Sequence, residues 1–116
     1  MSAEIRPLPG DDPVTSRETE AAGGFRIDGE RDGDGRLVRP VGELDLLTAP
    51  VLAEALARSE PDETLVVDLA RVTFLDSSGL RALLLAHEDG AMLRSPSSPA
   101  RTTFQVARVS SVLVDP

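Results

Sequence analysis

The sequence predicts a single α/β domain with a small mixed β-sheet of four to five strands and three helices. Residues 65–69 are almost all apolar, which is typical of a central strand that pairs in parallel. Apolar residues recur at helical spacing on both sides of this strand. The resulting order of strand, helix and strand favours a parallel pair with a crossover helix, and therefore the α/β class.

The composition limits both the architecture and the kind of partner. A chain of 116 residues with 41% hydrophobic residues has room for one domain with its own core. The formal charge of −8 disfavours nucleic acid and anionic membranes as partners, since both attract basic proteins. The absence of Cys excludes disulfides and thiolate chemistry. Because no segment has the pattern of a signal peptide or a membrane span, we expect a cytoplasmic protein.

Residues 1–22 are predicted to be a disordered acidic tail. The segment contains three prolines, no aromatic residue, and five acidic residues against two basic ones. Such a composition buries too little apolar surface to offset the entropy that is lost on ordering. The folded domain is therefore expected to span residues 23–116.

A β-hairpin is predicted at the start of the domain. Residues 25–28 form its first strand, and the Asp-Gly pairs in residues 31–35 form its turn, because they supply the positive φ values that tight hairpins need. Residues 37–44 form the returning strand. Pro40 lies inside that strand and lacks a backbone N–H, so we expect a bulge or a gap in the pairing there.

Two amphipathic helices are predicted to flank the central strand. Thr48 is placed to cap the first helix, which has Pro50 in its first turn and ends near Ser59. The second helix follows residues 74–75 and stops at Asp89, which is followed by Gly. The inward faces consist of Leu52, Ala55 and Leu56 in the first helix and of Leu80, Leu83, Leu84 and His87 in the second.

The C-terminal part is predicted to be shortened. Few residues remain in the segment 87–92 for the end of the second helix and the following turn, so residues 91–94 form only a brief strand. We expect residues 91–94 to be the least ordered part of the domain. Ser98 is placed to cap the third helix, with Pro99 in its first turn, and residues 112–114 to form a last edge strand.

The motif Asp76-Ser77-Ser78-Gly79-Leu80 stands where a strand is followed by a helix. The first N–H groups of a helix lack partners within the helix and carry a partial positive charge, so an oxygen or phosphate is stabilised there by about 0.3 to 1 kcal/mol. Ser77 therefore has two interpretations. It is either the helix cap, for which Ser is a common choice, or an exposed hydroxyl open to modification. Gly79 fits either a close backbone approach or access for a partner.

Two stretches of the sequence are similar to a known family. Residues 41–50 (VGELDLLTAP) and 66–85 (VVDLARVTFLDSSGLRALLL) resemble the anti-anti-sigma factor family, whose domain is also called STAS. The similarity is continuous over residues 25–85 and weakens beyond them, where members usually have a longer second helix and a full fourth strand. The predicted mixed sheet with three helices is therefore STAS-like, with a shortened C-terminal part.

The resemblance implies a role for Ser77 and its surroundings. In the family, the first Ser of this turn is phosphorylated by a partner serine kinase, which is itself the anti-sigma factor. Ser78 takes a position where relatives also have Ala or Thr, so its hydroxyl is expected to be structural. From the residues alone, Asp45 is either a turn acid or a functional carboxylate. The resemblance places its loop beside the serine turn, and the implied partner-binding residues are Asp45, Thr48, Asp76, Ser78, Gly79 and Leu80.

The sequence does not support an enzymatic or metal site. His87 is the only His and lies ten residues after Ser77 on the same helix, about 15 Å away at 1.5 Å per residue, which is too far for a catalytic base. The chain has no Lys for a nucleotide-binding P-loop. Acidic residues after Asp28 resemble a calcium loop, but Arg39 stands at the twelfth position, where a Glu is needed. One His and no Cys leave no zinc site, so we expect neither metal nor cofactor.

The sequence therefore predicts an anti-anti-sigma factor that is a substrate and a binding module, not an enzyme. The unphosphorylated form is expected to bind an anti-sigma factor serine kinase and release a sigma factor, and phosphorylation of Ser77 to end this binding. A phosphatase is a further expected partner. The alternative is a STAS interaction or scaffold domain of a signalling complex, or a module that senses a nucleotide or lipid and is never phosphorylated.

Overall fold

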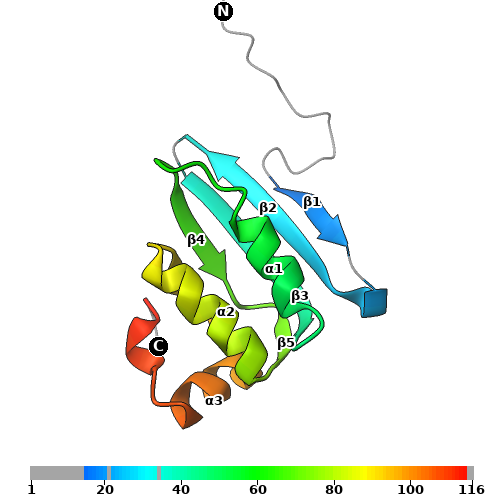
Figure 1. The fold of residues 1–116 in the computed structure, drawn as a ribbon, viewed down its shortest axis with the longest axis vertical. Helices are drawn as coiled ribbons and strands as arrows, with labels where there is room; N and C mark the ends of the chain where they lie inside the picture. The colour runs from blue at the N-terminus through cyan, green and yellow to red at the C-terminus, as the bar shows by residue number, and fades with distance from the viewer. Residues whose placement is uncertain (1–14, 21, 34, 115–116) are drawn as a thin grey trace, which may run out of the picture.

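The computed structural model describes residues 15–20, 22–33 and 35–114. Within these residues the chain forms one mixed β-sheet with three α-helices (Figure 1). The predicted fold class is confirmed. The sheet has six strands, whereas four to five were expected. The elements are β1 (Thr15–Glu20), β2 (Arg26–Asp32), β3 (Gly35–Leu44), α1 (Ala49–Leu56), β4 (Thr64–Asp68), β5 (Val72–Leu75), α2 (Ser77–Glu88), β6 (Met92–Arg94) and α3 (Ser98–Val106), with short 3-10 turns at Ala22–Gly24 and Ser110–Val112.

The sheet combines an antiparallel half with a parallel half. Its strand order is β1-β2-β3-β4-β6, and β5 pairs with β3 outside this path. β1, β2 and β3 are antiparallel neighbours, whereas β3 pairs in parallel with both β4 and β5, and β4 pairs in parallel with β6. α1 and α2 lie side by side on one face of the sheet (Figure 1). Because each of these two helices connects parallel strands, they run in the same direction.

Pro40 lies where β3 exchanges one parallel neighbour for another. β4 pairs with residues 35–38 of β3, and β5 pairs with its last residues from Gly42 onward. On this side of β3, the residues between these two stretches have no partner in β4 or β5. Pro40 lies among them, so its lack of an N–H costs the sheet no hydrogen bond. The predicted gap in the pairing is therefore confirmed. Gly42 then adopts a φ of +118°, which favours glycine, and donates its N–H to the carbonyl of Arg71 at 3.0 Å.

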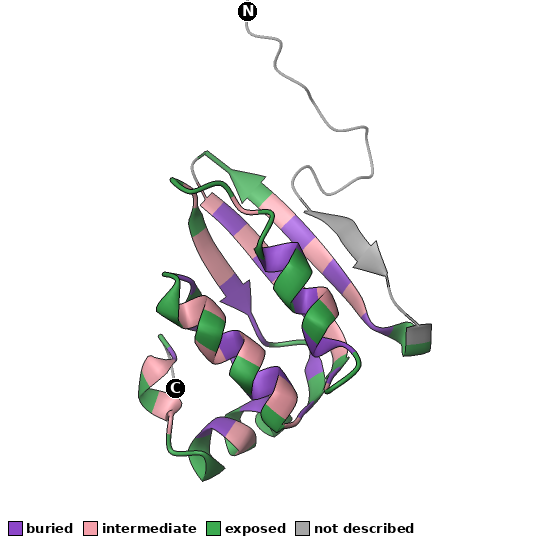
Figure 2. Ribbon diagram, viewed as in Figure 1, coloured by how far each residue is buried: buried purple, intermediate pink, exposed green. Residues whose placement is uncertain are grey.

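The core lies between the sheet and the two helices. Burial alternates along β2 and β3, and the helices bury the faces that point to the sheet (Figure 2). Leu52 and Ala55 of α1 and Leu83 of α2 are fully buried. The predicted apolar faces of both helices are therefore confirmed. At the end of α2, His87 lies half-buried with its Nδ1 3.1 Å from the carbonyl oxygen of Ala91.

The expectation of a disordered tail is wrong for residues 15–20. These residues form β1, which pairs with β2 from Thr15 opposite Glu30 to Glu20 opposite Arg26. A strand at the edge of a sheet is held by backbone hydrogen bonds, so a low apolar content does not prevent it. The argument from composition considered only burial and missed this contribution. Residues 1–14 and 21 lie outside the described residues.

The C-terminal part differs from the prediction at the last strand. β6 is short, as expected, and Leu93 within it is fully buried. The predicted edge strand at residues 112–114 is wrong, because the chain forms a 3-10 turn over Ser110–Val112 and then meets β6 at one bridge, between Leu93 and Leu113. A three-residue strand offers too short an edge for a longer pairing.

α3 covers the outer edge of β5 with hydroxyl groups. Its cap is Ser97, one residue before the predicted position, and the Ser97 Oγ accepts from the N–H of Ala100 at 3.3 Å. The same hydroxyl donates to the carbonyl of Val72 at 2.5 Å. Further along the helix, Thr103 donates its hydroxyl to the carbonyl of Leu75 at 2.8 Å. α3 therefore satisfies carbonyl groups that β5 does not use in pairing with β3.

The other face of the sheet carries a row of alternating charges. Asp28 pairs in register with Arg39, and Asp68 pairs with Arg94 on the neighbouring strands. Arg39 approaches Asp68 at 3.6 Å, and Arg94 approaches the same carboxylate at 3.8 Å. Opposite charges on adjacent strands each contribute roughly 0.2–1 kcal/mol. This row joins β2, β3, β4 and β6 from the side opposite to α1 and α2.

The beginning of α2 lies directly against the end of β3, at Gly79. A Cβ at this position would lie 2.5 Å from the carbonyl oxygen of Leu44 and 2.8 Å from Cδ1 of Leu75. Both separations are shorter than a Cβ atom tolerates from another heavy atom. The first involves a backbone oxygen, which cannot rotate away as a side chain can. The close backbone approach that the sequence left open for Gly79 is therefore confirmed.

Gly79→Ala should destabilise the protein by about 1–3 kcal/mol, because the added methyl group forces α2 away from β3. The better helix propensity of Ala, worth about 1 kcal/mol, is too small to reverse this. Chemical denaturation measures the difference in the free energy of unfolding. Ser78→Ala is the matched control, and a Gly79→Ala protein as stable as that control would contradict the packing described here.

Thr103→Val should lower stability by about 1–3 kcal/mol, since it leaves the Leu75 carbonyl without its donor. Thr102→Val is the matched control, because Thr102 is exposed on the same helix and has the same shape. Thermal denaturation of the two variants gives the comparison. Equal melting temperatures would show that the Thr103 hydroxyl adds nothing to the attachment of α3.

Candidate functional site

Two loops leave the sheet side by side at the carboxyl ends of β3 and β5. These strands are parallel neighbours, and Leu44 pairs with Leu75 as the last residue of each. The backbone N–H of Asp76 donates to the carbonyl of Leu44 at 3.2 Å. Asp45 and Asp76 are therefore equivalent positions, each the first residue after its strand. The predicted neighbourhood of the Asp45 loop and the serine turn is present in the structure.

Asp76, not Ser77, caps α2. The Asp76 carboxylate accepts from the N–H of Gly79 at 2.9 Å, in the usual geometry of a helix N-cap. Ser77 is the first residue of the helix, and its side chain is exposed. The structure records no hydrogen bond from its hydroxyl to another described residue. Of the two interpretations of Ser77, the capping role is thereby excluded, and an accessible hydroxyl remains.

The Asp45 loop is organised by its own side chains. The Asp45 carboxylate accepts from the N–H groups of Leu47 at 3.0 Å and Thr48 at 3.1 Å. The Thr48 hydroxyl donates to the carbonyl of Glu43 at 2.7 Å and accepts from the N–H of Asp45 at 2.9 Å. Thr48 stands at the cap position of α1 but makes no side-chain cap bond, so the predicted capping by Thr48 is wrong. Its hydroxyl closes the loop instead.

Two exposed leucines lie at the tip of this loop, and the sequence analysis missed both. The side chains of Leu46 and Leu47 are 71% and 82% exposed. Their sequence signal is a pair of apolar residues between Asp45 and Thr48 that belongs to neither the strand pattern nor the helical stripe. Exposed neighbouring apolar side chains beside a functional motif are typical of a protein-binding surface.

The predicted partner-binding residues divide into a surface group and a buried group. Asp45, Asp76 and Ser78 are partly exposed; Asp76 and Ser78 flank the exposed Ser77 in the chain, and Asp45 follows the neighbouring strand β3. Thr48, Gly79 and Leu80 are buried, with at most 8% of Thr48 and 7% of Leu80 exposed. Within the buried group, Thr48 closes its own loop and Gly79 packs against Leu44, and only the first group lies at the surface.

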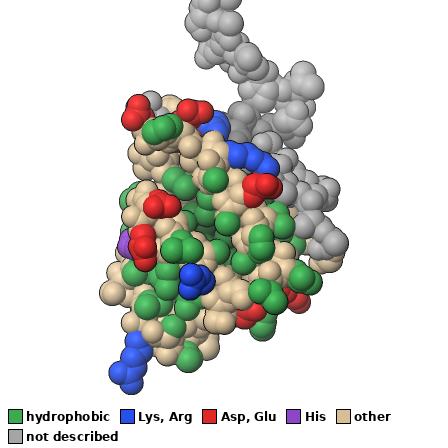
Figure 3. Space-filling model, viewed as in Figure 1, with side chains coloured by type: hydrophobic (Ala, Val, Ile, Leu, Met, Phe, Trp, Pro, Cys, Tyr) green, Lys and Arg blue, Asp and Glu red, His purple; other side chains and the backbone are tan. Residues whose placement is uncertain are grey.

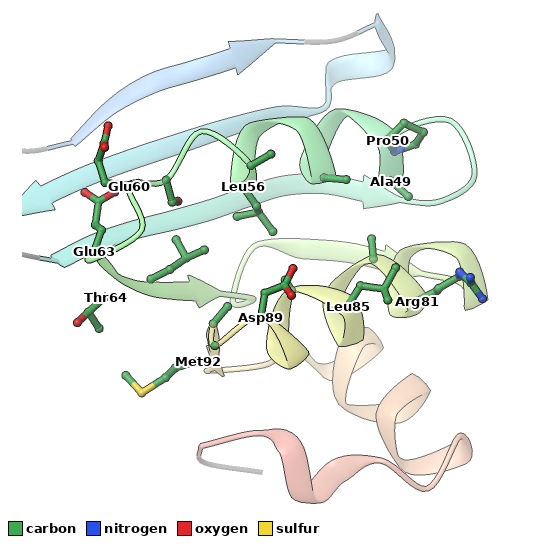
Figure 4. Close-up of a pocket in the computed structure, with 18 of the residues that line it drawn as sticks. Ala49, Pro50, Leu56, Glu60, Glu63, Thr64, Arg81, Leu85, Asp89 and Met92 are labelled. Carbon is green, nitrogen blue, oxygen red and sulfur yellow. Dashed lines mark hydrogen bonds between the residues drawn. The ribbon is translucent and has the colours of Figure 1, made fainter.

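A groove of about 900 Å³ opens between α1 and α2 (Figure 4). Hydrophobic side chains gather on the face of the molecule formed by these helices, with charged side chains around them (Figure 3). Ser78, Arg81 and Leu85 line both this groove and a smaller hollow of about 560 Å³ that Ser77 also lines. The serine turn and the groove therefore form one continuous surface.

The described residues contain no group of three or more His, Cys, Asp or Glu side chains that could hold a metal ion. None of the helices in this part of the chain has the length and apolar character needed to cross a bilayer. His87 lies at the opposite end of α2 from Ser77.

Comparison with known proteins gives a family and a set of related folds. The STAS domain family model matches residues 26–113. A crystal structure of an anti-sigma factor antagonist from Mycobacterium paratuberculosis is 27% identical, with a TM-score of 0.68 over 82% of this chain and 87% of that one. The anti-sigma factor antagonist SpoIIAA in its unphosphorylated form is 22% identical, with a TM-score of 0.58 over 80% of this chain and 88% of its own.

A third structure, the STAS domain of an antisigma-factor antagonist from Rhodobacter sphaeroides, is 20% identical, with a TM-score of 0.50 over 81% of this chain and all of that one. At these identities SpoIIAA and the Rhodobacter protein show a shared fold only. The comparison with curated protein sequences finds no significant match.

The family match covers most of the chain and nearly all of the described domain. It includes both stretches on which the resemblance was based, residues 41–50 and 66–85, and with them the serine turn. The resemblance inferred from the sequence is therefore confirmed, and the chain belongs to the STAS domain family.

Proposed function

We propose that this protein is an anti-anti-sigma factor. In the unphosphorylated state it binds an anti-sigma factor serine kinase and thereby releases a sigma factor, and phosphorylation of Ser77 ends the binding. It acts in the cytoplasm as a substrate and a binding module, not as an enzyme, and a phosphatase restores the active form. The observation that carries the proposal is the exposed Ser77 at the start of α2, beside Asp45 and Asp76.

The surroundings of Ser77 support a role as a kinase substrate. Because Asp76 caps the helix, modification of Ser77 does not remove the cap. The hydroxyl lies at the positive end of α2, where a phosphate gains about 0.3 to 2 kcal/mol. A kinase can therefore modify the residue without unfolding the helix.

The same position makes a phosphate incompatible with a covered surface. For unit charges about 5 Å apart, repulsion is roughly 1 kcal/mol in water and about 3 kcal/mol at an effective dielectric near 20. A docked partner excludes water, so it raises the repulsion between a phosphate and the nearby carboxylates of Asp45 and Asp76. The phosphate carries up to two negative charges, so the increase in repulsion exceeds the stabilisation of about 0.3 to 2 kcal/mol that the helix N-terminus provides. Binding should weaken about tenfold or more, since 1.4 kcal/mol is a factor of ten.

The modification itself gives the first test of the proposal. Purified protein is incubated with ATP and a panel of anti-sigma factor serine kinases from the same cell, and mass spectrometry locates the phosphate. We expect phosphate on Ser77 and none in Ser77→Ala, because Ser77 is the exposed hydroxyl at the helix start. Ser78→Ala is the matched control and should still be phosphorylated. A phosphate at another residue, with Ser77 unmodified, would disprove the switch.

The effect on affinity gives the second test. Protein with phosphoserine incorporated at position 77 should bind the kinase identified in the first test at least tenfold more weakly than the unmodified protein. Isothermal titration calorimetry measures both dissociation constants. Ser78→Asp is the control, because it places a negative charge at the neighbouring, partly buried position and leaves Ser77 unmodified. Equal affinities of the modified and unmodified proteins would favour the alternative of a scaffold STAS domain.

A further inference from the structure

The groove between α1 and α2 has a defined direction. Both helices run the same way, so their N-terminal ends meet at one end of the groove and their C-terminal ends at the other. Pro50 and Arg81 lie at the first end, and Glu60 and Asp89 lie toward the second (Figure 4). From Arg81 to Asp89 the helix rises about 12 Å at 1.5 Å per residue.

The walls of the groove are apolar and partly uncovered. Ala53 of α1 and Ala82 of α2 are small, which leaves space between the helices. Leu85 and Met92 remain 48% and 42% exposed along the groove, and Leu46 of the Asp45 loop stands 71% exposed at its N-terminal end. Three large apolar side chains along one channel exceed the scattered exposure that is normal for a protein surface.

The two ends of the groove have opposite charge. Two parallel helix dipoles add, so the N-terminal end is positive and the C-terminal end negative. The side chains that line the groove have the same polarity, because Arg81 lies at its N-terminal end and Glu60 and Asp89 lie toward its C-terminal end. The carboxylates of Asp45 and Asp76 also stand at the N-terminal end, but they do not line the groove and accept hydrogen bonds from backbone N–H groups of their own loops. The structure records no ion pair between Arg81 and another described residue, so its guanidinium is available to a ligand.

We propose that this groove docks an amphipathic helix of two to three turns from the protein partner, with a basic N-terminal end beside Glu60 and Asp89 and an acidic C-terminal end beside Arg81. A helix in this orientation is antiparallel to α1 and α2, which its own dipole favours. Its apolar face covers Leu85 and Met92, as in other complexes of a helix with an apolar groove. The inference extends the proposed function, since it names a second contact of the same partner.

Other occupants fit the groove less well. A second copy of this chain carries the same charge of −8, so two copies repel one another. A small apolar ligand matches the volume, since ligand sites typically enclose roughly 300–1,000 Å³. It would leave the charges at both ends unused, however, and the groove is open along its length. An apolar helix with opposite charges at its ends uses all of these features.

Arg81 links the groove to the phosphorylation site. It stands four residues after Ser77 on α2, and the two residues line the same hollow. An acidic group four residues before a basic one is the favourable order for pairing on a helix. A phosphate on Ser77 would therefore attract the Arg81 guanidinium and cancel the positive end of the groove. Modification of Ser77 then weakens the helix contact as well as the contact with the serine turn.

Two synthetic peptides of about twelve residues test the orientation. Both carry leucines at every third or fourth position on one face, and both are stapled on the other face so that they are equally helical. The first has Lys in its first turn and Glu in its last turn, and the second has these residues exchanged. Fluorescence anisotropy with the unphosphorylated full chain should show at least tenfold tighter binding of the first peptide. Equal binding of the two peptides would overturn the proposal.

Variants of the full chain test the location. Leu85→Glu should weaken the first peptide at least tenfold, whereas Val106→Glu, at a 78% exposed position on α3, should leave its affinity unchanged. Glu60→Lys combined with Asp89→Lys should remove the preference between the peptides, because both ends of the groove are then basic. Amide chemical shift changes in the wild-type protein should map to α1 and α2, so the test does not depend on any variant folding.

The remaining outcomes separate this inference from the proposed function. Shift changes confined to another face, or dodecanoate binding the groove more tightly than the first peptide, would overturn the helix proposal. The peptide experiment uses unphosphorylated protein and no kinase, so its result is independent of whether Ser77 is ever modified. Conversely, phosphorylation of Ser77 with no peptide binding would retain the proposed function and exclude the groove contact.

Discussion

The close contact between the start of α2 and the end of β3 determines where every surface residue of the site lies. Gly79 has no side chain, so the backbone of α2 reaches the carbonyl of Leu44. This contact joins two loops that are more than thirty residues apart in the sequence, one after Leu44 and one after Leu75. It also sets the direction of α2 beside α1, and with it the groove. The position of the exposed site therefore depends on a buried contact.

The sequence could predict those parts of the fold that depend on burial. The apolar stripes of both helices and the central strand follow from periodicity, because burial is the largest favourable term in folding. Pro40 predicted the gap between β4 and β5, since a residue without an N–H is tolerated only where no partner needs one. β1 was not predicted because backbone hydrogen bonds attach it to β2, and the side-chain pattern of a sequence does not report on backbone groups. The single bridge at Leu113 escaped it because the length of β6 decides how much edge is left to pair.

The site was predicted less completely than the fold, for a related reason. The motif located Ser77 at a helix start, but either Asp76 or Ser77 can cap a helix, and only the backbone geometry decides between them. Thr48 resembled a cap from its position and instead closes a loop, because Glu43 and Asp45 offer its hydroxyl nearer partners. The exposure of Leu46 and Leu47 depends on how the loop leaves the sheet. Local patterns therefore identify candidate residues, whereas tertiary contacts assign their roles.

A phosphorylation switch on this surface would need no conformational change. Ser77 belongs to a capped helix that is fixed to the sheet through Gly79 and, by way of β5, to α3 through Thr103. Adding a phosphate there changes the charge of the surface while the helix keeps its place. In the proposed switch, the phosphorylated and unphosphorylated forms therefore differ in affinity through electrostatics at the interface, and a change of conformation is not required. Because Arg81 lines the same hollow as Ser77, the proposed modification would act on the serine turn and on the groove together. A small domain can therefore change its affinity strongly with one covalent event.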